Sequence, residues 1–137
     1  MQRPEVKAFK YELRNYSFYC YRVRTLSESI EYCYQILGGV HGVDPSRIPM
    51  HSPKNLDREY KLRDEISRLE AEKDRLQRQI DYVDQILDRI GNGMENAIKS
   101  VYIEGQQMRK VADDYYLSHS GLQGRINKAI MEALNED

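Results

Sequence analysis

Apolar residues recur in steps of three and four along two long stretches of the chain, which predicts two long helices. The first stretch covers residues 4–37 and begins with Pro4, a residue favoured in the first helical turn. Gly38-Gly39 follows its last periodic residue, so we expect the helix to end there. Its apolar seam consists of Tyr16, Tyr19, Val23, Leu26, Ile30, Cys33 and Leu37.

The second stretch covers residues 53–90 and starts with a serine N-cap followed by a proline, Ser52-Pro53. Its seam keeps the same spacing from Leu62 to Ile90 and is interrupted by Lys73. A charge-rich helix with one narrow seam buries too little alone, so we expect the two helices to form a long antiparallel hairpin or coiled coil. Lys73 either fixes register and oligomer state or extends its ammonium to solvent.

Residues 38–52, between the two helices, contain Pro45 and Pro49 and show no periodicity. A loop of this length inside a compact domain is uncommon and often functional. It could contact DNA or a partner through His41, Arg47 and His51, or it could connect antiparallel helices. We favour the connector. A metal site is not expected, because no carboxylate or cysteine stands at ligand spacing beside the histidines.

Two shorter amphipathic helices are predicted near the C-terminus. The first covers about residues 108–115, and the second follows Ser118 or Ser120 as N-cap. Two such helices joined by a turn of about three residues suggest a helix-turn-helix, whose second helix reads the major groove of DNA. The same spacing also fits a helical hairpin that only packs. The second helix is expected to bury Leu122, Ile126, Ala129, Ile130, Ala133 and Leu134.

A break at Gly91-Asn92-Gly93 divides the predicted long hairpin from the C-terminal helices and is expected to act as a hinge. We therefore expect an all-α protein with two domains, an oligomerisation module over residues 1–90 and a small helix-turn-helix domain over residues 94–137. A short helix in between, from Met94 to Tyr102, would be the third member of the small domain.

Polar side chains collect on the outer face near the start of the last helix, and these are the candidate base-reading residues. Gln123 and Asn127 lie one helical turn apart, and Gln and Asn can each form two hydrogen bonds with adenine. His119 and Ser120 precede them. Four basic residues are placed to contact DNA phosphates, namely Arg109, Lys110, Arg125 and Lys128.

Several short sequence pieces in this region carry a family resemblance. They are Tyr102–Gly105 (YIEG), Val111-Ala112, Ser118, Leu122 and Lys128–Leu134 (KAIMEAL). Residues 101–134 resemble region 4 of bacterial sigma factors and, more closely, the RinA/ArpU-type regulators of late genes in phages of Gram-positive bacteria. The resemblance implies an activator of a phage or mobile-element late operon that binds double-stranded DNA and contacts bacterial RNA polymerase.

Tyr116 departs from that resemblance. Many helix-turn-helix turns have glycine four residues after the small residue of the first helix, which here is Ala112. A bulky side chain resists the left-handed backbone conformation of such a turn by roughly 1–2 kcal/mol. We therefore expect this turn to differ in length.

The charge of the chain argues against strong DNA binding by a single copy. The formal net charge is −1 at pH 7, and the residues from 92 onward carry five basic and seven acidic side chains. Non-specific binding should be weak, which makes a homo-oligomer more important for function. The tyrosines of the first helix, with interleaved arginines, could stack on single-stranded nucleic acid, but half of them fall on the seam and are expected in the core.

Other classes of protein find no support in the sequence. No apolar run is long enough to span a membrane, and the first residues lack the apolar core of a signal peptide, so a cytoplasmic location is expected. There is no phosphate-binding glycine loop, no Cys-x-x-Cys pair and no histidine pair one turn apart, so neither an enzyme nor a cofactor is expected. The sequence leaves two functions open: a DNA-binding transcription regulator, and a helical protein–protein adaptor whose helix-turn-helix does not bind DNA.

Overall fold

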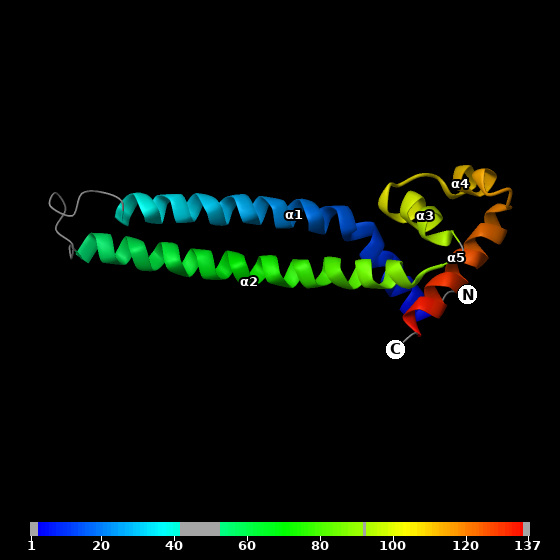
Figure 1. Ribbon diagram of the computed structural model, residues 1–137, viewed down its shortest axis with the longest axis horizontal. Coiled ribbons are helices and arrows are strands. Elements are labelled where there is room, and N and C mark those ends of the chain that lie inside the picture. The colour runs from blue at the N-terminus through cyan, green and yellow to red at the C-terminus, as the bar shows by residue number, and fades with distance from the viewer. Residues whose placement is uncertain (1–2, 42–52, 92, 136–137) are drawn as a thin grey trace. The chain divides into compact units, whose positions relative to one another are not determined.

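The computed structural model describes residues 3–41, 53–91 and 93–135, and all elements within these ranges are helical (Figure 1). The predicted all-α fold is therefore confirmed. Within the same ranges, none of the helices combines the length and the apolar character that crossing a bilayer requires. The elements are α1 (Pro4–His41), α2 (Pro53–Arg89), α3 (Met94–Ile98), a π-helical segment η1 (Lys99–Ile103), α4 (Met108–Asp114) and α5 (His119–Leu134).

The prediction that Gly38-Gly39 ends the first helix is wrong, because α1 continues through both glycines to His41. Glycine in a helix costs only about 1 kcal/mol relative to alanine. For the two glycines the cost is about 2 kcal/mol, which the burial of Leu37 directly before them, worth about 1.5–3 kcal/mol, offsets. Residues 42–52, which include Arg47 and His51 of the predicted connector, lie outside the described residues.

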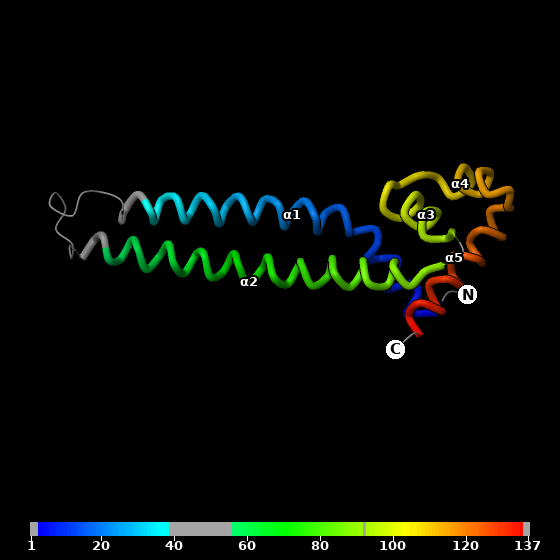
Figure 2. The backbone as a smooth tube through the Cα atoms, viewed as in Figure 1, coloured from blue at the N-terminus to red at the C-terminus, as the bar shows by residue number. Residues whose placement is uncertain are grey.

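The chain forms two compact units. We call Cys20–Gln77 the hairpin unit, and Met1–Tyr19 together with Arg78–Asp137 the terminal unit. In the hairpin unit, α1 and α2 run side by side in opposite directions (Figure 2). The Arg22 guanidinium and the Glu72 carboxylate form an ion pair at 3.2 Å, and Tyr34 donates a hydrogen bond to Glu70.

The apolar seams predicted for the two helices form the core of the hairpin unit. The buried side chains are Leu26, Ile30, Cys33, Leu37, Ile66, Leu69 and Leu76. Lys73 is half-buried between the last two of these. Outside the seam, Tyr21 and Tyr32 of α1 are exposed over more than half of their surface, and so is Tyr60 of α2. These three tyrosines are not part of the core.

The division into units differs from the expected one at residues 90–94. Val6, Phe9 and Leu13 of α1 are buried in one core with Val83 and the C-terminal helices. Ile90 before the glycines and Met94 after them are both buried in this core, whereas Gly91 and Gly93 are themselves exposed. The first turns of α1 therefore belong with the helix-turn-helix, and the glycines do not separate two domains. The physical reason is that the apolar stripe of α1 begins at Val6, before the predicted seam, and these additional apolar residues must also be buried against other helices.

The short elements before α4 pack against the two helices of the helix-turn-helix, α3 against α5 and η1 against α4. Met94, Ala97 and Ile98 of α3 are buried, and α3 packs against α5. The helix then widens into η1, and the chain reverses at Glu104-Gly105, where Gly105 has a φ of 76°. This conformation suits glycine, which has no Cβ to clash. The expected third helix is therefore present, divided into α3 and η1.

Candidate nucleic-acid interface

The turn between α4 and α5 has the conformation of a helix-turn-helix despite its bulky residue. Tyr116 adopts a left-handed backbone with φ 58°. The Leu117 N–H donates to the Ala112 carbonyl at 2.9 Å and the Tyr116 N–H to the Asp113 carbonyl at 3.1 Å, which is the Schellman pattern of helix termination. Leu117 packs against the core beneath the turn. These bonds offset the strain at Tyr116, so the expectation of a different turn length is wrong.

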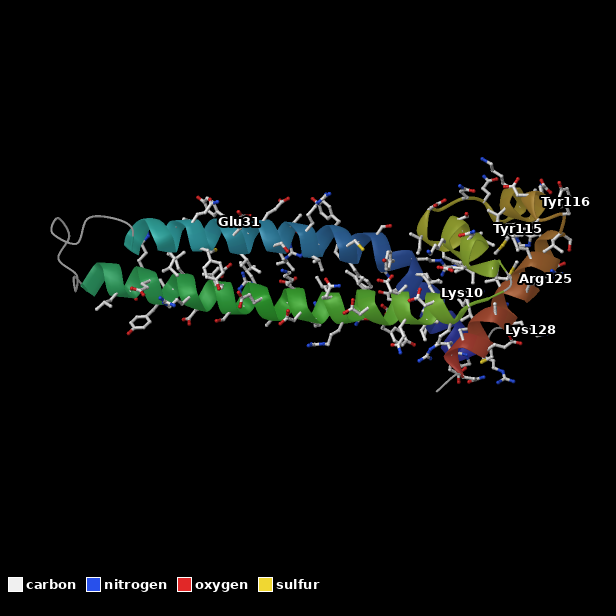
Figure 3. All side chains as sticks on the ribbon, in the orientation of Figure 1. Lys10, Glu31, Tyr115, Tyr116, Arg125 and Lys128 are labelled. Carbon is white, nitrogen blue, oxygen red and sulfur yellow. The ribbon has the colours of Figure 1, made fainter. Side chains whose placement is uncertain are left out.

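The Tyr116 side chain itself takes no part in this packing, because 96% of its surface is exposed. It projects at the outer edge of the turn (Figure 3). The neighbouring Tyr115 is half-buried, and its hydroxyl donates to the Gly93 carbonyl at 3.3 Å. One of the two tyrosines therefore ties the turn to the segment before α3, and the other meets solvent.

Ser118 is the N-cap of α5, as the sequence predicts. Its Oγ accepts a hydrogen bond from the Gly121 N–H at 3.0 Å, which satisfies one of the free backbone donors at the start of the helix. Gly121 leaves room for this bond, because a Cβ built on it would lie 2.9 Å from the Ser118 Oγ. A Cβ on Gly124, one turn along, would meet nothing within 4 Å.

This difference leads to a prediction for two alanine substitutions. Gly124→Ala should stabilise the protein by about 0.5–1 kcal/mol through helix propensity. Gly121→Ala should be less favourable than Gly124→Ala by about 1 kcal/mol, because it displaces the capping hydroxyl. Urea denaturation of the two variants measures this difference. Equal stabilisation by both substitutions would show that the Ser118 cap contributes little.

The inner face of α5 agrees with the predicted apolar pattern. Leu122, Ile126, Ile130 and Ala133 are buried, whereas Ala129 and Leu134 are half-buried against the same core. The helix is anchored at its far end too, where the Arg89 guanidinium donates to the Ala133 carbonyl at 3.3 Å. The orientation of α5 within the terminal unit is thus fixed at both ends.

Most candidate DNA-contacting residues are accessible. His119, Ser120, Arg125 and Lys128 of α5 are exposed, as are Arg109 and Lys110 in the first turn of α4. Arg125 and Lys128 line a shallow hollow together with Met94 and Glu132, and Figure 3 labels them along α5. Carboxylates are exposed on the same two helices, including Asp113 and Asp114 of α4 and Glu132 of α5.

Gln123 and Asn127 do not face outward as expected, because both are half-buried. Each directly follows a buried residue and so borders the apolar stripe of α5. The first turns of α1 lie beside this edge, since Phe9 and Glu12 line one hollow together with Met131 of α5. The Asn127 Oδ1 accepts a hydrogen bond from the Lys10 ammonium of α1. Among the predicted base-reading residues, Asn127 therefore already has its amide oxygen bound within the protein.

Lys10 is a residue that the sequence analysis missed. Only 1% of its surface is exposed, and burial, followed by the charge of Arg14, lowers its pKa from 10.5 to about 8. The Lys10 Nζ and the Arg14 guanidinium carbon each lie 5.3 Å from the centre of the Tyr102 ring, in range for cation–π attraction. Burial also raises the pKa of Tyr102. The available signal was the position of Lys10 on the stripe that includes Val6 and Leu13.

Within the described ranges, no group of three or more histidine, cysteine, aspartate or glutamate side chains could hold a metal ion. Comparison with known proteins found no matching family model, no similar curated protein and no similar solved structure.

Proposed function

We propose that the chain is a sequence-specific DNA-binding transcription regulator in which α5 enters the major groove. The observation that carries this proposal is the junction of α4 and α5, with its left-handed residue at Tyr116 and its cap at Ser118. In helix-turn-helix proteins the N-terminal residues of the second helix contact base edges. His119 and Ser120 stand at that position and are exposed.

The basic residues around this helix support contact with the DNA backbone. Arg125 and Lys128 lie three residues apart and therefore on neighbouring parts of one face of α5. Arg109 and Lys110 are exposed in the first turn of α4. Four such contacts would fix the position of the protein on the duplex, and the base-facing residues would supply specificity.

The resemblance to sigma-factor region 4 and to RinA/ArpU-type regulators supports a more specific role. On that basis we propose that the protein acts in the cytoplasm of a bacterial host cell and activates late genes of a phage or mobile element. Bacterial RNA polymerase would be its protein partner.

The principal test of DNA contact uses Arg125→Ala and Lys128→Ala. Each variant should bind every DNA sequence more weakly and should reduce the slope of log binding constant against log salt by about one unit, because each removes one phosphate contact. Arg75→Ala removes an exposed arginine from α2 in the hairpin unit and is the matched control. Titrations of labelled duplex at several salt concentrations give the slopes. Unchanged slopes in folded Arg125→Ala and Lys128→Ala would contradict a DNA-facing α5.

A protein–protein adaptor is the second candidate, and two observations favour it. The chain has a formal net charge of −1, and large aromatic side chains are exposed on the hairpin unit, among them Tyr32 and Tyr60. Aromatic residues are enriched at protein interfaces. The adaptor function requires no affinity for DNA, so retention on a heparin column at low salt distinguishes the two candidates.

We also propose that copies of the chain associate through the hairpin unit, because two helices provide a small core. Static light scattering should give the mass of at least a dimer. Lys73 is the polar residue of the α2 seam, and Lys73→Leu should raise the melting temperature and change the measured mass if Lys73 sets the oligomer state. A wild-type chain that stays monomeric at high concentration would contradict the association. Unaltered mass in Lys73→Leu would mean that the ammonium only reaches solvent.

A further inference from the structure

The hydrogen bond from Lys10 to Asn127 joins the start of α1 to the proposed recognition helix. Both residues belong to the terminal unit, although 117 positions separate them in the sequence. Figure 3 labels Lys10 on the N-terminal part of α1. Lys10 is buried, and Asn127 is half-buried on the edge of α5.

This contact determines which way the Asn127 amide is turned. A lysine ammonium has three hydrogen-bond donors and no acceptor, whereas the asparagine amide has an accepting oxygen and a donating NH2 group. A reversed amide would place its NH2 against the ammonium, donor against donor. The Asn127 oxygen is therefore directed inward, and the NH2 group is the part of the amide left for an external partner.

The environment of Lys10 keeps the oxygen in place. The ammonium lies 5.3 Å from the centre of the Tyr102 ring. Burial and then the positive charge of Arg14 lower its pKa. Within the described ranges, the Asn127 oxygen is the hydrogen-bond acceptor found for this ammonium. A buried charged group that loses its acceptor is costly. Turning the oxygen toward DNA would impose that cost.

The inward oxygen changes what Asn127 can recognise. Two hydrogen bonds to adenine require the amide oxygen to accept from N6 while the NH2 group donates to N7. With its oxygen directed inward to Lys10, Asn127 cannot place its oxygen and its NH2 group together against the edge of one base, so the NH2 group makes the base contact. In the major groove, guanine offers two acceptors, N7 and O6, whereas adenine offers N7 alone beside a donor.

We propose that Lys10 is a positioning residue that makes Asn127 a hydrogen-bond donor in the major groove, so that Asn127 selects guanine over adenine. The inference rests on the proposed function, because it takes α5 to be the recognition helix. Beyond the proposed function, the inference states which base is preferred at one position of the operator and names Lys10 of α1 as the cause.

The test is selection of binding sites from a random duplex library by the full chain and by three variants. Lys10→Met removes the donor and keeps a side chain of similar length. Lys7→Met removes an exposed lysine one turn earlier on α1 and controls for lost charge. Asn127→Ala identifies the base pair that Asn127 reads, because preference should be lost there.

At that base pair, the wild type and Lys7→Met should prefer guanine over adenine by up to about five-fold, the lower end of what a contact with two hydrogen bonds provides. Lys10→Met should reverse the preference toward adenine and leave the other base pairs unchanged. A merely structural role would weaken all positions together.

Three outcomes overturn the inference. The first is a wild-type preference for adenine at the Asn127 position. This outcome can be observed even if no Lys10 variant folds. The second is an identical motif for the wild type and Lys10→Met. The third is a motif that Asn127→Ala leaves unchanged. A wild-type chain that enriches no sequence contradicts the proposed function itself, and the inference with it.

Discussion

Phe9→Ala is expected to lower the free energy of unfolding by about 3–5 kcal/mol, because the ring is 2% exposed and its removal leaves a cavity in the core of the terminal unit. The ring also makes an edge contact with Tyr82, with centroids 6.2 Å apart. Urea denaturation followed by far-UV circular dichroism measures the loss. The signal should report melting of the C-terminal helices together with the start of α1, because they share one core.

Phe18→Ala is the matched control for Phe9→Ala. Phe18 lies on the same helix and in the same unit, but 58% of its surface is exposed. Its replacement should change stability by no more than about 0.5 kcal/mol. Similar effects of the two substitutions would contradict the burial of the first turns of α1 against the helix-turn-helix.

Lys10 should make the stability of the protein depend on pH between about 8 and 10.5. Its pKa is about 8 in the folded chain against an ordinary 10.5, so the unfolded chain binds more protons across this window. Stability therefore rises with pH there. Below pH 8 the cost of burying the charged ammonium is fully present, on the order of 1–3 kcal/mol. Lys10→Met should remove that cost and the associated slope.

The measurement is the difference in unfolding free energy between Lys10→Met and the wild type from pH 7 to pH 9.5. The difference should be largest at pH 7 and should shrink as the pH rises. Lys7→Met, which removes an exposed lysine, should give no such trend. A constant difference for Lys10→Met would mean that the Lys10 pKa is not lowered in the folded protein.

The local elements of the fold could be predicted because their causes are local. The spacing of Leu122, Ile126 and Ile130 determines the buried face of α5. Ser118 caps that helix because a serine oxygen can reach the N–H three residues later. The two long helices followed in the same way, apart from the glycines near the end of α1, where packing outweighed propensity.

The turn at Tyr116 shows how a local rule can fail. A rule based on single residues assigns the left-handed conformation to glycine. Here two backbone hydrogen bonds and the burial of Leu117 stabilise that conformation in tyrosine. The sum of such contributions could not be read from the residue type alone.

The environment of Asn127 depends on contacts between distant parts of the chain. Its position on α5 followed from helical periodicity, but its partner Lys10 comes from the other end of the sequence. The apolar residues around Lys10, Val6 and Leu13, extend the stripe of α1 beyond the predicted seam. Their partner could have been α2, another copy or the C-terminal helices, and periodicity does not distinguish these.

The most direct test of DNA recognition by α5 compares the dissociation constants of the full chain for the most enriched duplex from a random library and for a scrambled duplex, at one physiological salt concentration. A sequence-specific regulator should bind the enriched duplex at least about 10³-fold more tightly. Arg125→Ala should weaken both complexes, because its contact is to phosphate. Equal dissociation constants of the wild type for the two duplexes would contradict the account.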